Sequence, residues 1–259
     1  MQQVGELTER YNQYCLAEDD QVKQGLLYDI LSQHKFVKSG AVEELDLPQH
    51  RFEIQRFQLD VRGFQRWLNR TSEGKVFRSV GGGVSDDALY TLSPMLRELL
   101  PRGLHSVLAF PKEGIDAGMT QLWFRGIPKF TGLLEGDEDE QSNSHQANFF
   151  YGGSSIDQAD HLFMTRKSNG ENAKMSLVVI DGVRYMLAGS KNTCLIWPAA
   201  EPSEKYYPLA QGVHDIGCHV GAVLSEWYRS KTEAGQDALF DEFTQAGYTT
   251  MMAELNRPW

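Results

Sequence analysis

The sequence has few cysteines and no long apolar run. Only three cysteines, Cys15, Cys194 and Cys218, occur in 259 residues, and they lie far apart. A scattered, odd-numbered set excludes a disulfide framework and is typical of a reducing compartment. No stretch approaches the roughly 20 consecutive apolar residues of a membrane span, and the opening MQQVGELTERYNQY lacks the apolar core of a signal peptide. We therefore expect a cytoplasmic or nuclear protein without a membrane partner.

Positive charge is also scarce. The chain has 25 Lys and Arg against 35 Asp and Glu, a net charge of −10 at pH 7. This balance excludes a general nucleic-acid coat, so any nucleic-acid site must be a local basic patch. A further absence is the Gly-Lys-Ser/Thr triplet after the glycines at 81–83, which excludes a Walker loop and favours a flexible connector.

What the sequence does contain is the pattern of an α+β protein. Apolar residues at helical spacing predict a helical region over residues 1–48, and the alternation in RFEIQRFQLDV (51–61) predicts a half-buried strand. After Pro101, short apolar runs between turns predict the strands of one mostly antiparallel sheet. These runs are LHSVLAF, TQLWF, HLFMTRK, KMSLVVI, VRYMLAGS and TCLIW.

The last part of the chain returns to helical patterns. GVHDIGCHVGAVLSEWYRS and QDALFDEFTQAG predict two helices, and YTTMMAEL predicts a final strand. Asp181-Gly182 between two apolar runs predicts a type I′ hairpin turn. We expect one domain over residues 1–259, with the helical region at 1–48 and a sheet-rich core at 50–259.

Lys167 is the residue whose surroundings could support chemistry. In RKSNGE (166–171) it stands between an apolar run and an Asn-Gly pair, which is a common turn. A lysine amine is nucleophilic only when neutral, and burial or the charges of Arg166, Lys174 and Lys191 would lower its pKa. Taken alone, the stretch predicts an ordinary turn with a solvated lysine.

Other short segments stand around Lys167 in a particular order. In chain order, the segments are Arg102-Gly103-Leu104, Arg125-Gly126, Lys129-Phe130, Glu135-Gly136, Lys167-Ser168-Asn169-Gly170, Ser190-Lys191 and Glu254. This order resembles the RNA ligases of the covalent nucleotidyltransferase superfamily, most closely the ligase module of fungal-type tRNA ligases, over residues 100–255. The resemblance implies a nucleotidyltransferase fold of mostly antiparallel sheets with flanking helices, and ATP-dependent joining of RNA ends.

The resemblance also implies a role for each matched residue. Lys167 would attack the α-phosphate of ATP and carry a lysyl–AMP, which passes to an RNA 5′-phosphate before a 3′-hydroxyl displaces AMP. Arg102 and Lys129 match cations that contact the phosphates, and Lys191 matches a basic position near the α-phosphate or the RNA end. The other matched nucleotide-binding positions are Arg166, Asn169, Gly170 and Glu254. The implied cofactors are ATP and Mg²⁺ or Mn²⁺, and the implied partner is RNA, such as tRNA halves.

Two features depart from the family pattern. Thr131 and Gly132 replace an aromatic residue and an asparagine, and no Lys-x-Lys pair follows Glu254. We therefore expect a fragment whose core lacks its last strands. The alternatives are a catalytically inactive relative that binds RNA or a protein, and another nucleotidyltransferase such as a capping enzyme. His214 and Cys218 lie one helical turn apart, but without a second ligand pair they predict a packed helix face and no metal site.

Overall fold

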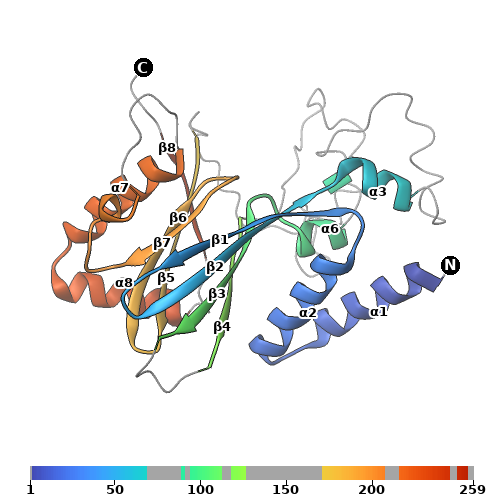
Figure 1. The fold of residues 1–259 in the computed structure, drawn as a ribbon, viewed down its shortest axis with the longest axis horizontal. Coiled ribbons are helices and arrows are strands. Elements are labelled where there is room, and N and C mark those ends of the chain that lie inside the picture. The colour runs from blue at the N-terminus through green and yellow to red at the C-terminus, as the bar shows by residue number, and fades with distance from the viewer. Residues whose placement is uncertain are drawn as a thin grey trace, which may run out of the picture. The chain divides into compact units, whose positions relative to one another are not determined.

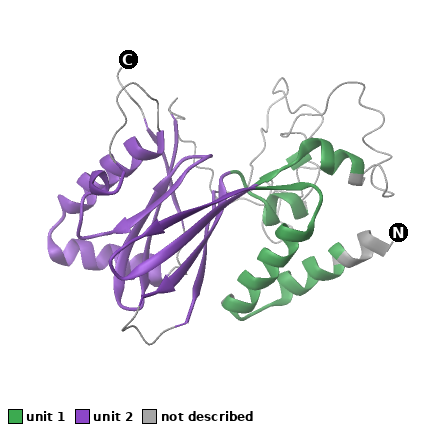
Figure 2. Cartoon of the chain, in the orientation of Figure 1, with its two compact units in different colours: residues 1–39, 58–102, 128–167 green, residues 40–57, 103–127, 168–259 purple. Residues whose placement is uncertain are grey.

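The computed structural model describes residues 2–68, 89–90, 94–112, 118–126, 171–207, 216–245 and 250–255. The chain divides into two compact units, each built from several stretches of sequence (Figure 2). The first unit comprises residues 1–39, 58–102 and 128–167, and the second comprises residues 40–57, 103–127 and 168–259.

The first unit is mainly helical where it is described. Helices α1 (Gln2–Leu16) and α2 (Asp20–Gln33) lie side by side, and the short connection between them makes the pair antiparallel (Figure 1). The Asp19 carboxylate caps α2 by accepting a hydrogen bond from the Val22 N–H at 2.9 Å. Helices α3 (Val61–Leu68) and α6 (Pro94–Leu99) belong to the same unit. Its buried apolar side chains include Leu7, Leu27, Ile30, Leu31, Phe64 and Leu96.

The second unit contains two four-stranded antiparallel sheets. Sheet A has the strand order β1 (Val37–Asp46), β2 (His50–Leu59), β3 (Leu104–Pro111) and β4 (Thr120–Phe124). Sheet B has the order β7 (Cys194–Pro198), β6 (Val183–Gly189), β5 (Glu171–Ile180) and β8 (Met251–Leu255). The outer ends of β1 and β2, residues 37–39 and 58–59, are counted with the first unit.

Alternate side chains of a strand point to opposite faces, and β5 uses both faces for packing. Val178 and Ile180 join the apolar core that sheet B shares with sheet A, whereas Met175 and Leu177 join a second core with helices α7 and α8. The second unit therefore has three layers, which are sheet A, sheet B and the helix pair (Figure 1). The two helices are α7 (Ile216–Arg229) and α8 (Glu233–Gln245), and a short 3-10 helix, η4 (Ser203–Lys205), precedes them.

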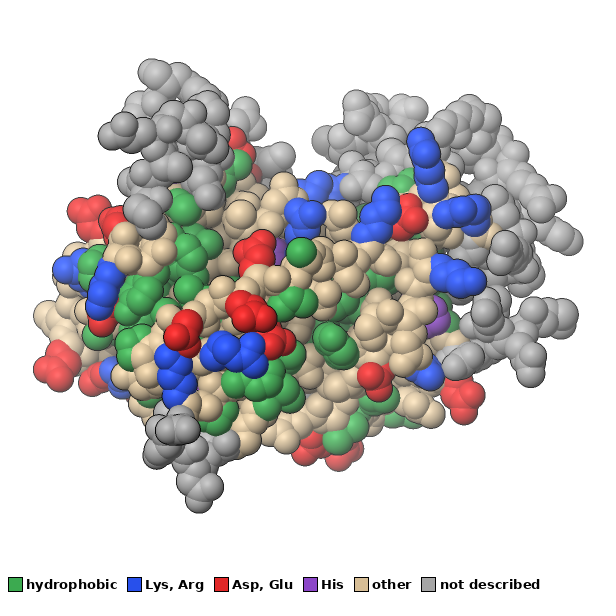
Figure 3. All heavy atoms as spheres, viewed as in Figure 1, with side chains coloured by type: hydrophobic (Ala, Val, Ile, Leu, Met, Phe, Trp, Pro, Cys, Tyr) green, Lys and Arg blue, Asp and Glu red, His purple; other side chains and the backbone are tan. Residues whose placement is uncertain are grey.

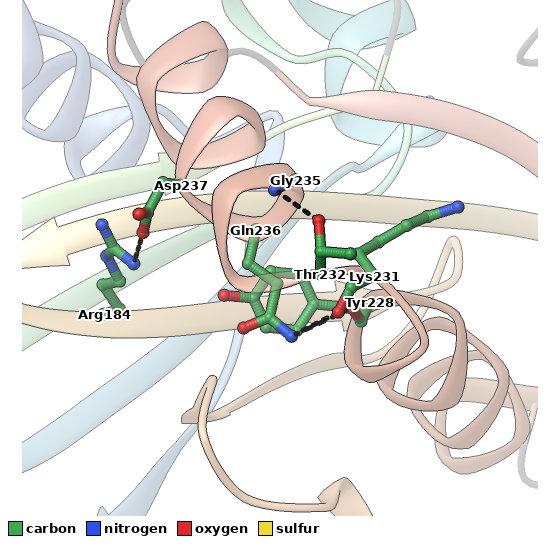
Figure 4. Close-up of polar contacts among 7 residues, drawn as sticks. All are labelled: Arg184, Tyr228, Lys231, Thr232, Gly235, Gln236 and Asp237. Carbon is green, nitrogen blue, oxygen red and sulfur yellow. Dashed lines mark hydrogen bonds and ion pairs between the residues drawn. The ribbon is translucent and has the colours of Figure 1, made fainter.

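Polar contacts attach α8 to its neighbours (Figure 4). The Thr232 hydroxyl accepts from the Gly235 N–H at 3.2 Å and so caps the start of α8. The Gln236 amide donates to the Tyr228 carbonyl at the end of α7, 3.4 Å away. An ion pair between Arg184 and Asp237 joins β6 to α8. The helix layer is therefore held by caps and a surface ion pair as well as by its apolar face.

The structure confirms most of the expected elements and corrects two expectations. The strand predicted at 51–61 is present as β2 but ends at Leu59, because Val61 begins α3. The strands predicted from 104 onward are present where they lie within the described residues. Asp181 and Gly182 have the positive φ values, 48° and 76°, of a type I′ turn. The helical prediction for residues 1–48 is wrong over Val37–Asp46, which form β1. The strands belong to two sheets and not to one. The run HLFMTRK lies outside the described residues.

None of the helices among the described residues is long and apolar enough to cross a membrane.

Candidate functional site

The amino-terminal end of β5 is where the chain enters sheet B after the Lys167 segment. β5 begins at Glu171, and Lys167 itself lies outside the described residues. In the ladder with β6, Lys174 pairs with Gly189, and in the ladder with β8, Asn172 pairs with Glu254. The end of β6 and the acidic residue of β8 therefore flank β5 at the same end of sheet B.

Lys191 is presented by a tight turn that joins β6 to β7. The Ser190 N–H donates to the Thr193 carbonyl at 3.1 Å, and the hydroxyls of the same two residues lie 2.9 Å apart. The Asn192 N–H donates to the Ser190 hydroxyl at 3.2 Å. Ser190 is buried and Lys191 is exposed. In this Ser-Lys pair the serine fixes the turn, and the lysine ammonium is available to an anion.

Glu254 lies on a face of sheet B that the register defines. Residues that pair directly across antiparallel strands share a face, so Glu254 shares a face with Asn172, and the alternation along β5 adds Lys174 to that face. This is the face that packs against sheet A farther along β5, through Val178 and Ile180. Glu254 itself is exposed. Because β6 and β8 are two strands apart, the Lys191 turn and Glu254 are separated by about 10 Å across the sheet, which one nucleotide can span.

Lys174 is fully buried at this end of sheet B. Its ammonium donates a hydrogen bond to the Gly103 carbonyl and lies 4.2 Å from the centre of the Phe124 ring, both in sheet A or at its edge. Burial lowers the pKa of Lys174 to about 8. Burial also raises the pKa of the Cys194 thiol to about 12, so this thiol stays neutral beside the ammonium.

His105 shares the carbonyl that Lys174 contacts. Its Nδ1 lies 3.0 Å from the Gly103 oxygen, and because a carbonyl only accepts, Nδ1 carries the proton. Burial and the charge of Lys174 lower the pKa of His105 to about 3, although hydrogen bonds to the backbone of Gly103 and Asn192 favour the charged form. The imidazole is therefore neutral, and the Gly103 carbonyl accepts from two side chains.

The glycine of the Arg-Gly-Leu segment is required by this arrangement. Gly103 has φ +76°, and a Cβ there would lie 3.0 Å from the Lys174 Nζ and 3.2 Å from both the Cα and the carbonyl oxygen of Lys191. Gly189 is equally confined, because a Cβ would lie 2.0 Å from the Thr193 oxygen. The backbone that follows Arg102 and the turn that presents Lys191 are thus packed directly against each other.

A second cation reaches the Lys191 turn from sheet A. Arg56 pairs with His105 in the β2–β3 ladder, and its guanidinium donates to the Asn192 side-chain oxygen at 3.2 Å. The charge of Arg56 is among the causes that lower the pKa of His105. Arg56 and Lys191 therefore place positive charge at the same end of the sandwich, where an anionic ligand would be stabilised.

The structure brings together only some of the residues predicted from the sequence. Lys191 and Glu254 lie at the same end of sheet B, as described above. Arg102 is counted with the first unit, where its guanidinium carbon lies 5.7 Å from the centre of the Tyr90 ring. The remaining predicted residues lie outside the described residues, and they are Lys129, Arg166, Lys167, Asn169 and Gly170.

Three residues of this region are not among the predicted site residues: Lys174, His105 and Arg56. The signal for Lys174 is its two-residue spacing from Ser176, Val178 and Ile180, which puts it in the row of buried side chains. His105 and Arg56 have no comparable local signal, because their positions follow from the pairing of β2 with β3.

Within the described ranges, no group of three or more His, Cys, Asp or Glu side chains could hold a metal ion. Cys218, considered above as a ligand, is buried in the core beneath α7. No family model matches the sequence, and neither a curated protein nor a solved structure shows a significant match.

Proposed function

We propose that this chain is the adenylyltransferase part of an ATP-dependent RNA ligase of the tRNA-ligase type. It would form a lysyl–AMP on Lys167, transfer the AMP to an RNA 5′-phosphate and seal that end to a 3′-hydroxyl. The cytoplasm or nucleus is the compartment we propose, since both hold such RNA ends.

One observation carries the proposal. The segments that resemble ligase motifs are far apart in sequence, yet the register of sheet B brings two of them to the end of the sheet where β5 begins. These two are the turn that presents Lys191 and the strand that carries Glu254, and β5 begins four residues after Lys167 in the sequence. The Arg-Gly segment joins them through the hydrogen bond from Lys174 to the Gly103 carbonyl.

The first chemical step needs a neutral amine at Lys167. Its lone pair attacks the α-phosphorus of ATP, a nitrogen–phosphorus bond forms, and the bond from the α-phosphorus to the bridging oxygen of pyrophosphate breaks. The amine loses a proton, and pyrophosphate leaves with the bonding electrons. Positive charge near the triphosphate stabilises the charge that moves onto pyrophosphate.

The other residues would bind the nucleotide. We assign the phosphates to Arg102, Lys129, Arg166 and Lys191. We assign the nucleoside and its ribose to Asn169, Gly170 and Glu254. Mg²⁺ or Mn²⁺ would arrive with the triphosphate and neutralise part of its charge, as is usual for a metal that keeps most of its waters and few protein ligands. The exposed carboxylate of Glu254 suits such a water-mediated contact.

Covalent labelling tests the proposal directly. The protein is incubated with ATP labelled at the α-phosphate and Mg²⁺, denatured, and separated on a gel. We expect label on the wild type and none on Lys167→Ala, because only the amine of Lys167 forms the phosphoramidate. Added pyrophosphate should remove the label, because it reverses the step and regenerates ATP.

The matched control is Lys231→Ala, which removes an exposed lysine at the end of α7. This variant should label like the wild type. Label that persists on Lys167→Ala would overturn the assignment of the nucleophile. A wild-type protein that takes up no label would overturn the proposed activity and favour the inactive, RNA- or protein-binding alternative.

A further inference from the structure

The start of α3 carries a cluster of positive charge that the proposed catalytic residues do not include. It consists of Lys35, Lys38, Arg62 and Arg66, all of which belong to the first unit and are exposed. We call this set the basic surface. On the face shown in Figure 3, blue side chains gather over the part of the first unit that carries α3.

The backbone around Asp60 brings the four cations together. The Asp60 N–H donates to the Phe36 carbonyl at 2.7 Å, which joins the segment of Lys35 and Lys38 to the start of α3. A Cβ on Gly63 would lie 2.7 Å from the Lys35 carbonyl oxygen, so the two segments are in close contact. Arg62 and Arg66 are one helical turn apart, and the Arg66 Nε donates to the Arg62 carbonyl at 3.2 Å.

Asp60 is the acid at the centre of the basic surface. Its partial burial would raise the pKa of its carboxyl, but the hydrogen bond from the Gly63 backbone and the charges of Lys38 and Arg66 lower it overall. The Lys38 Nζ lies 3.4 Å from this carboxylate. Among the described residues, the four cations and Asp60 together carry a net charge of +3, on a chain whose net charge is −10. The basic surface therefore has the opposite sign to the molecule as a whole.

We propose that the basic surface binds the phosphate backbone of the RNA substrate. Exposed lysine and arginine side chains bind phosphates through charge and hydrogen bonds, independently of base sequence. The net negative charge of the protein opposes RNA binding in general, so local clusters of cations decide which parts of the molecule the strand contacts. That the partner is RNA rests on the proposed function. The charge and geometry of the basic surface are features of the structure and do not depend on that proposal.

An RNA-binding titration tests this proposal. It uses a 5′-phosphorylated single-stranded RNA oligonucleotide and measures binding by fluorescence anisotropy at a series of salt concentrations. The variant is Arg62→Gln with Arg66→Gln, which changes the net charge from −10 to −12. We expect its affinity to fall about tenfold or more, and the slope of log K against log salt to become shallower by about 1.4, or about 0.7 for each lost phosphate contact.

The matched control is Arg229→Gln with Lys231→Gln, an equal change in charge at exposed positions of the second unit. It should bind RNA like the wild type, and circular dichroism should show both variants folded. An equal loss of affinity in both variants would overturn the proposal, because net charge alone would then explain binding. RNA affinity that is unchanged in the α3 variant would also overturn the proposal. So would an α3 variant that loses binding to anionic lipid vesicles but keeps its affinity for RNA.

Self-adenylylation separates this proposal from the proposed function. That reaction needs no RNA, so the α3 variant should still label with AMP at Lys167. If the wild type fails to label but RNA binding depends on the basic surface, the proposed ligase activity is overturned and the assignment of RNA binding to the basic surface stands. If the wild type labels normally but RNA binding does not depend on the basic surface, the proposed ligase activity stands and the proposed RNA-binding surface is overturned.

Discussion

Lys174 shows at the scale of one residue how this fold holds a charge inside its core. A buried ammonium is costly unless it is paired or hydrogen-bonded, and within the described part of the chain the Lys174 ammonium contacts one carbonyl and one aromatic ring. Burial lowers the pKa of its ammonium. Lys174 therefore lowers stability at neutral pH while it holds Gly103 and the Lys191 turn in place.

This cost has a defined pH dependence. The pKa of Lys174 falls from an ordinary value of 10.5 to about 8, so between these values the unfolded chain binds more protons than the folded protein. Stability must then rise with pH across this window, by about 3 kcal/mol from this group. We expect the free energy of unfolding of Lys174→Met to lack this rise. Urea denaturation of both proteins from pH 7 to pH 10.5 measures the difference.

A control for this prediction is the same exchange at the exposed Lys231. Lys231→Met should keep the pH dependence of the wild type, since no burial is relieved. A difference between the wild type and Lys174→Met that stays constant with pH would show that the Lys174 ammonium is not destabilised by burial.

The burial of Lys174 is a feature that could not be predicted from the sequence near that residue. The matched residues Lys191 and Glu254 could be placed at strand ends from turn and strand patterns alone, and the register then puts them at one end of sheet B. The apolar residues around Lys174 indicate a buried strand, but a lysine is seldom fully buried unless it is paired. Its burial depends on sheet A, and in particular on Gly103 and Phe124, which are distant in sequence.

At the scale of elements, the β5–β6 hairpin is fastened to sheet A by a buried chain of hydrogen bonds. His50, at the start of β2, has its Nδ1 2.8 Å from the Tyr185 hydroxyl and its Nε2 2.9 Å from the Asp181 carboxylate. A carboxylate only accepts, so Nε2 carries a proton, and the second ring nitrogen, Nδ1, shares a hydrogen bond with the Tyr185 hydroxyl. Both His50 and Tyr185 are fully buried. These hydrogen bonds therefore connect the two sheets, and neither side chain is accessible to a substrate.

A double-mutant cycle measures this fastening. We expect Tyr185→Phe to cost about 1 kcal/mol and His50→Ala about 2–4 kcal/mol, because the second leaves a cavity and a buried hydroxyl without its partner. The two costs should fall short of additivity by about 1 kcal/mol in the double variant, as chemical denaturation would show. As a control, His50→Ala combined with Tyr228→Phe in the helix-facing core should be additive. Additive costs for the first pair would mean that the hydrogen bond does not contribute.

Elements with a local cause are those that the sequence predicts well. The Asp181-Gly182 turn, the alternating strand β2 and the amphipathic helices α7 and α8 each have their signal within a few residues. β1 has no such signal, because its side chains are mostly exposed and its apolar residues do not alternate. It becomes a strand by pairing with β2, a tertiary effect that overrides local pattern. The division into two sheets likewise depends on which strands pair. β5 is apolar on both faces, so its sequence does not indicate which face packs against a second sheet and which against helices.

At the scale of the whole molecule, charge decides how the protein can meet RNA. The net charge of −10 opposes a polyanion, and both signs of charge are present on the face shown in Figure 3. Binding must therefore depend on a limited number of phosphate contacts. The fold supplies such contacts at the basic surface of the first unit, and separately at the Lys191 turn of the second unit.

The salt dependence of the wild type follows from that limit. Each phosphate contact with single-stranded RNA contributes about 0.7 to the slope of log K against log salt, so the four cations of the basic surface allow a slope of about 3 at most. We expect anisotropy titrations of the wild-type protein to give a slope near this size, to which a contact at the Lys191 turn would add about 0.7. A much steeper slope would mean that the strand contacts cations well beyond the basic surface, and then the protein would have to bind RNA over a broad face despite its net negative charge. A shallow slope that becomes shallower still in the α3 double variant assigns phosphate contacts to the basic surface.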